Sequence, residues 1–102
     1  MIVLTPLRPP GPPRTVTRAF TIGGPAPPGT ALPATWQLAG LPAALHCVIA
    51  PSPALGAWVI KDLGAGTAVN GLRVSAVTAM PLHRGDRLAC GGAEFEVIPD
   101  PP

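Results

Sequence analysis

The side chains of this chain that could bind a soft metal ion are two histidines and two cysteines: His46, Cys47, His83 and Cys90. A structural zinc site needs four such ligands arranged as a tetrahedron, and closely spaced pairs such as Cys-x-x-Cys usually supply them. Here two of the four are adjacent and no Cys-x-x-Cys pair occurs. We therefore expect no metal site, and we expect Cys47 and Cys90 to point inward as small apolar side chains.

Groups that could carry out catalysis are equally scarce. Ser52 and Ser75 have no neighbouring base in the sequence that would activate a hydroxyl nucleophile. The glycine pairs Gly23-Gly24 and Gly91-Gly92 lack the lysine that completes a phosphate-binding loop. The sequence thus predicts a protein that is not an enzyme and that uses no cofactor.

Charged residues are few and dispersed. The 102 residues include seven Lys and Arg and five Asp and Glu, which gives a net charge of +2. Nucleic-acid-binding surfaces normally combine a basic stripe with aromatic side chains, but the basic residues here form no run and only 4% of the chain is aromatic. We therefore expect no nucleic-acid partner.

No apolar segment approaches the roughly 20 residues that are needed to cross a bilayer. Met1–Leu7 is apolar, but it is too short for a signal peptide and contains Pro6. We expect a cytoplasmic protein without a membrane partner. Lys61 is the only lysine, whereas Arg, Ala, Pro and Gly are plentiful, which is typical of a GC-rich, bacterial genome.

Proline and glycine determine the class of fold. The 16 prolines and 12 glycines interrupt the chain too often for a helical bundle, while a hydrophobic fraction of 47% is sufficient for a core. Asn70-Gly71 between two β-prone runs predicts a hairpin, and Ala93–Ile98 alternates like a half-buried strand. Asp86 is expected to cap its turn. The sequence predicts an all-β antiparallel sandwich of two sheets with roughly eight to eleven short strands.

The N-terminal half is predicted to supply further strands. Met1–Leu7 is expected to form an edge strand, and Thr15–Ile22 a single strand. Gly23–Pro33 is expected to be a long Pro/Gly loop, followed by a short strand that places Trp36 and Leu38 in the core.

Several of these segments occur in an order that resembles the forkhead-associated (FHA) domain. The motifs that carry the resemblance are Phe20–Gly23, His46–Ile49, Asp62–Gly64, Gly66–Gly71, Leu82 followed by Gly85-Asp86, and Phe95–Val97. The resemblance covers about Phe20 to Ile98. It implies the FHA β-sandwich and a non-catalytic interaction module, in which loops at one end of the sandwich grip a phosphothreonine peptide.

Three of the family's ligand contacts are missing at the positions that the resemblance implies. The arginine that follows the glycine is Gly24 here, and the serine of Ser-x-x-His is Ala43. His46 remains, but in the family it mainly supports the loop. The loop Gly64–Thr67 is two residues shorter and lacks the asparagine that holds the peptide backbone. Because a phosphate dianion needs an arginine and hydroxyl donors, the resemblance implies an FHA domain that has lost phosphothreonine recognition.

The candidate partner-binding residues are the family-equivalent loop positions Gly24, Ala43, His46, Gly66, Thr67, Asn70 and Arg73. We expect a protein partner or a neighbouring domain to dock on the loop end formed by Gly23–Pro33, Gly40–Leu45 and Gly64–Thr67. This loop end is rich in apolar residues and proline, which suits a hydrophobic interface. Self-association through a sheet edge or face is a second route.

Two alternatives stay open. A relocated arginine, Arg73 or Arg18, could restore phosphothreonine binding. The chain could instead be the N-terminal regulatory domain of a larger bacterial protein that includes an enzyme. In either case we expect residues 1–98 to form the β-sandwich domain and residues 99–102 to begin a Pro-rich tail or linker.

Overall fold

The computed structural model describes residues 1–26, 28–29, 34–38, 41, 45–75 and 77–99. Within these residues all regular secondary structure is β, and no helix occurs that could cross a membrane. The strands are β1 (Ile2–Arg8), β2 (Arg14–Val16), β3 (Phe20–Gly23), β4 (Trp36–Gln37), β5 (Cys47–Ser52), β6 (Ala57–Asp62), β7 (Thr67–Val69), β8 (Leu72–Arg73), β9 (Met80–Pro81), β10 (Arg87–Cys90) and β11 (Ala93–Pro99).

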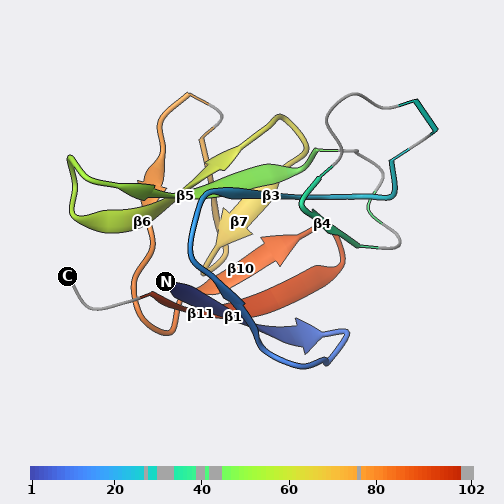
Figure 1. Cartoon of the computed structure of the whole chain (residues 1–102), viewed down its shortest axis with the longest axis horizontal. Helices are drawn as coiled ribbons and strands as arrows, with labels where there is room; N and C mark the ends of the chain where they lie inside the picture. Colours follow the sequence, from blue (N-terminus) through green and yellow to red (C-terminus); the bar gives the residue numbers. More distant parts are fainter. Residues whose placement is uncertain (27, 30–33, 39–40, 42–44, 76, 100–102) are drawn as a thin grey trace.

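The strands form two sheets that pack face to face (Figure 1). The first sheet has the order β2-β1-β11-β10-β7-β8, and the second has the order β4-β3-β5-β6-β9. The described pairings are antiparallel, except that β4 runs parallel to β3. The expected two-sheet β-sandwich is therefore confirmed.

The core lies between the sheets and follows the alternation of the strands. Its fully buried aliphatic side chains are Ile2, Leu4, Leu88 and Val97 from the first sheet and Ile22, Ile49 and Ile60 from the second. Each contributes about 1.5–3 kcal/mol by leaving water. Cys47 and Cys90 face each other from opposite sheets with their Sγ atoms 3.8 Å apart, so both thiols do point inward. Contact with Cys90 and burial raise the pKa of Cys47, which keeps it a neutral thiol.

Two predictions about the N-terminal half are wrong. Met1–Leu7 does not form an edge strand, because the proline-rich hairpin turns the chain back and β2 pairs with β1 on the side away from β11. Thr15–Ile22 is not one strand, because β2 and β3 belong to different sheets and residues 17–19 lead from one sheet to the other. These three residues are exposed, so their side chains give no sign of the change of sheet.

Trp36 and Leu38 lie at the border of the core rather than inside it. Both are half-buried and pack against the core. The Trp36 ring lies against that of Phe95, with their centroids 5.0 Å apart. An edge strand such as β4 has only one neighbour, so its side chains are covered on one side alone.

The two predicted turns have the expected chemistry. Asn70 and Gly71 have φ values of 52° and 80°, as a type I′ turn between β7 and β8 requires. The carboxylate of Asp86 accepts a hydrogen bond from the backbone N–H of His83 at 2.8 Å, which confirms the predicted cap. The Asn70 side chain joins the two turns: its Nδ2 donates to Asp86 at 2.9 Å, and its Oδ1 accepts from the Arg87 N–H at 2.9 Å.

Candidate functional site

The β6–β7 loop is fastened by a buried carboxylate. Asp62 ends β6 and is 3% exposed. It accepts hydrogen bonds from the Thr67 hydroxyl at 2.8 Å, the Gly66 N–H at 3.2 Å and the Gly64 N–H at 3.3 Å. Burial raises the pKa of the Asp62 carboxyl, but these three donors, with a smaller contribution from nearby His46, outweigh burial and hold the pKa below its usual value. The loop therefore folds around a side chain that carries a negative charge at neutral pH.

His46 supports the same loop from the other side. The side chain is 1% exposed, and Nε2 donates to the Gly66 carbonyl at 3.2 Å. The His46 backbone donates to the Ile22 carbonyl at 2.7 Å and accepts from the Leu63 N–H at 3.0 Å. His46 thus connects the end of β3, the start of β5 and the β6–β7 loop, and its buried imidazole cannot reach a ligand.

Arg73 is the positive charge at this loop. It lies on β8 opposite Ala68 of β7, and one terminal guanidinium nitrogen is 3.6 Å from where a Cβ on Gly66 would be. Gly66 has a φ of +92°, a backbone conformation that suits glycine. A shallow pocket of about 320 Å³ is lined by Ala65, Gly66, Thr67, Ala68, Gly71 and Arg73. An exposed arginine therefore borders a small-residue surface at the β6–β7 loop.

The structure brings together His46, Gly66, Thr67 and Arg73 of the predicted site residues. The Thr67 hydroxyl is buried and donates to Asp62, so it is not available to a ligand. Gly24 is buried directly after β3. Asn70 lies at the far end of β7, where its side chain joins two turns. Ala43 is outside the described residues.

Two exposed apolar side chains flank this network: Leu45, which ends the predicted docking loop Gly40–Leu45, and Leu63, which the sequence did not single out as a partner-binding residue. Leu45 and Leu63 are 36% and 42% exposed, and each is next in sequence to a residue of the network, His46 and Asp62 respectively. Leu45 directly precedes the motif His46–Ile49, and Leu63 lies within the motif Asp62–Gly64, but only the structure identifies which apolar side chains face solvent. We call Leu45, Leu63 and Gly64–Gly66 the loop surface.

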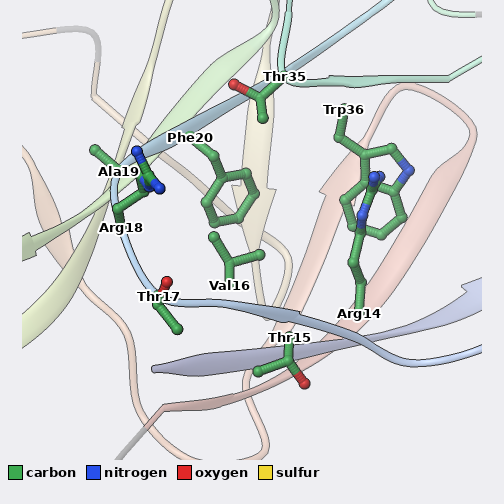
Figure 2. Close-up of a pocket in the computed structure, with 9 residues that line it drawn as sticks. All are labelled: Arg14, Thr15, Val16, Thr17, Arg18, Ala19, Phe20, Thr35 and Trp36. Carbon is green, nitrogen blue, oxygen red and sulfur yellow. The ribbon is translucent and has the colours of Figure 1, made fainter.

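A second pocket, about 410 Å³ in volume, was also missed (Figure 2). It lies where β2 and its connection to β3 meet β4, and Arg14, Arg18 and Trp36 are among its lining residues. No local pattern could have predicted it, because Arg14 and Trp36 are far apart in sequence and meet only through the arrangement of the strands.

Comparisons with known proteins identify the fold. The family model described as FHA domain matches residues 43–91. Among solved structures, the N-terminal FHA domain of Rad53p from S. cerevisiae, in complex with a phosphothreonine peptide, superposes with a TM-score of 0.77 at 16% identity, covering 97% of this chain and 93% of that chain. The FhaA FHA domain, in complex with the intracellular domain of Rv3910, gives 0.73 at 22% identity, covering 96% and 100%.

An FHA domain from an Arabidopsis thaliana hypothetical protein gives a TM-score of 0.72 at 23% identity, covering 94% of this chain and 82% of that chain. No curated protein sequence matches the chain. The family match and these folds confirm the resemblance on which the site assignment depends.

Proposed function

We propose that the chain docks a protein partner or a neighbouring domain through the loop surface, without reading phosphothreonine. Its match to the FHA family model over residues 43–91 and its FHA-like fold support a non-catalytic protein-interaction module. The observation that carries this proposal is a pair of exposed leucines next to the hydrogen-bonded residues His46 and Asp62. Leu45 and Leu63 are exposed, while the backbone of Leu63 is hydrogen-bonded to His46. Apolar side chains held on a rigid surface favour a hydrophobic contact, since little conformational entropy is lost on binding.

The residues that a phosphate would need support the same conclusion. The positions of the family's arginine and serine are Gly24 and Ala43, neither of which has a polar side chain. The Thr67 hydroxyl, at the start of β7, already donates to Asp62. Each charged hydrogen bond that a phosphate fails to make costs about 1.5–3 kcal/mol of affinity. The loss of several such contacts leaves no specific phosphothreonine site at the family position.

A second candidate function rests on Arg73. Its guanidinium borders Gly66, in the part of the fold where the family holds its peptide, and no acidic side chain among the described residues pairs with it. In this alternative Arg73 is the relocated arginine of a phosphothreonine reader. Arg18, the other candidate, lines the pocket at β2 and β4 and does not line the 320 Å³ pocket that contains Gly66.

The wider setting of the module is also a proposal. In the simplest case it works in the bacterial cytoplasm, and the docked surface is either a separate protein or an adjacent domain of a longer, enzyme-containing chain that it regulates. Self-association through a sheet edge is the remaining route. In each case the partner contacts backbone and apolar atoms rather than a phosphate.

A titration with a degenerate phosphothreonine peptide library, followed by amide chemical shifts, separates the two candidate functions. The docking module gives no phosphate-dependent shifts at millimolar peptide. Saturable shifts at Gly64–Thr67 and Arg73, absent with the unphosphorylated library and lost in Arg73→Gln, would instead establish the phosphothreonine reader.

The leucines can be tested through the partners that the domain captures. We expect Leu45→Ser/Leu63→Ser to release partners that the wild-type domain retains from a cell extract, whether or not the extract has been treated with phosphatase. Leu72→Ser is the matched control, because Leu72 is 68% exposed but lies on the β7–β8 hairpin, outside the loop surface. Partners that survive the double substitution and disappear after phosphatase treatment would contradict the proposal.

A further inference from the structure

We propose that the pocket between β2, its connection to β3, and β4 is a second docking site, which takes an acidic peptide segment of a partner protein. This second site goes beyond the proposed function, since none of the residues that line its pocket belongs to the loop surface. In this site carboxylates of the segment pair with Arg14 and Arg18, and an apolar side chain between them lies on Val16, Phe20 and Trp36.

The shape of the pocket sets the size of its occupant. The volume of about 410 Å³ is large for a single carboxylate and suits two or three side chains of a peptide. Figure 2 shows the Phe20 and Val16 side chains between the stacked Arg14 and Trp36 on one side and Arg18 on the other. Phe20 is buried beneath the pocket, whereas Val16 and Trp36 are half-buried and partly accessible. An occupant therefore meets an apolar floor between two cationic groups.

The charges of the pocket are unbalanced. Neither Arg14 nor Arg18 makes an ion pair among the described residues, and the described lining contains no Asp or Glu. Three threonines, Thr15, Thr17 and Thr35, supply the remaining polar groups. Two arginines that meet no acid among residues 1–99, as far as these are described, are complementary to acidic side chains of a partner.

Arg14 is already oriented for this role. Its guanidinium carbon lies 4.8 Å from the centroid of the Trp36 ring, and that ring packs against Phe95 of β11. Stacking on an aromatic face leaves the N–H groups at the guanidinium edge free to donate to a carboxylate. Because the side chain is held before binding, a ligand has less conformational entropy to overcome.

The backbone around the pocket favours an extended peptide over a compact anion. β2 and β4 are the terminal strands of their sheets on this side of the sandwich, so each has one edge that no described strand covers. β4 is fixed to β3 by the Thr35 N–H, which donates to the Thr21 hydroxyl at 3.0 Å. An extended segment can follow such edges while its side chains enter the pocket.

Amide-shift titration with defined peptides tests the proposal on the intact chain. The probe is a library of acetylated, amidated hexapeptides with a central leucine or phenylalanine flanked by glutamates, and the control library has glutamine at the same positions. We expect saturable shifts at Arg14–Phe20, Thr35 and the Trp36 indole with the glutamate library only, and weaker binding as salt is raised.

Single substitutions identify the cations. Arg14→Gln and Arg18→Gln should each weaken binding about five- to ten-fold, whereas Arg84→Gln, an exposed arginine at the turn before β10, should leave it unchanged. Several outcomes would overturn the proposal: equal binding of the glutamine library, shifts confined to the loop surface, affinities that neither substitution alters, or binding that requires a phosphothreonine in place of glutamate. The loop surface is untouched by these variants, so failure here leaves the proposed function standing.

Discussion

The pocket beside Arg73 and the pocket between Arg14 and Arg18 lie at opposite edges of the first sheet, and different interactions fix their shapes. At the β7–β8 edge, Arg73 borders a loop whose shape comes from a buried charge, Asp62, that is already satisfied by its own chain. At the β2 edge, Arg14 and Arg18 surround an apolar floor and meet no acid among the described residues. The charged groups at the two edges therefore differ in role. The Asp62 carboxylate holds the backbone of a loop, whereas Arg14 and Arg18 are exposed to solvent.

Substitutions at the β7–β8 edge should therefore change mainly the stability of the fold, and substitutions at the β2 edge should change mainly the binding of a partner. Changes to the Asp62 network should lower the free energy of unfolding and affect the whole fold. Changes to the β2 edge should leave the fold intact and affect only what binds there.

The largest effect is expected from Asp62→Asn. The substitution removes the negative charge and replaces one carboxylate oxygen by an NH₂ group, which cannot accept a hydrogen bond. Donors among the Gly64 N–H, the Gly66 N–H and the Thr67 hydroxyl then lose their acceptor. We expect a loss of about 3 kcal/mol in the free energy of unfolding, measured by urea denaturation. Glu94→Gln is the matched control: it removes an exposed partner of Arg8, 3.2 Å away, and should cost less than about 1 kcal/mol. Equal losses would show that the Asp62 network does not support the fold.

The same carboxylate should make stability depend on acid. Because the pKa of Asp62 is lower in the folded chain than in the unfolded chain, its contribution is complete above the unfolded value, about 3.9, and is lost as the pH falls through the lower folded value. Thermal unfolding followed from pH 6 down to pH 2.5 should show a steeper fall of Tm for the wild type than for Asp62→Asn. Parallel curves for the two proteins would mean that Asp62 has an ordinary pKa in the fold.

Gly66→Ala should have an intermediate effect. The φ of +92° is strained for any L side chain, and the new methyl group would lie 3.6 Å from the Arg73 guanidinium. We expect a loss of about 1–2 kcal/mol in the free energy of unfolding, together with amide-shift changes at Arg73. Gly92→Ala is the control, since no heavy atom lies within 4 Å of its Cβ position and its φ is not in the left-handed region. If both variants unfold alike, backbone strain at the loop is not what selects glycine.

The sequence predicted local features and features carried by the FHA resemblance. Asn70-Gly71 specifies its turn through backbone preferences alone, and the alternation of Ala93–Ile98 gives the burial of β11 directly. The break at residues 17–19 could not be predicted, because the alternating residue types of Thr15–Ile22 continue through it in the sequence, whereas the structure exposes all three residues between the two sheets. The Arg14–Trp36 contact depends on where the edges of two sheets meet, which no short-range pattern encodes.

The smallest effect on stability is expected from Arg14→Gln. This variant best distinguishes a residue that binds a partner from a residue that supports the fold. Arg14 is exposed, and its stacking on Trp36 is worth about 0.5–1 kcal/mol at most at such a site. Urea denaturation should therefore place this variant within about 1 kcal/mol of the wild type, while acidic-peptide binding falls several-fold. A loss as large as that of Asp62→Asn would instead make the β2 edge a structural support like the β6–β7 loop, because an arginine reserved for a ligand contributes little to the fold that presents it.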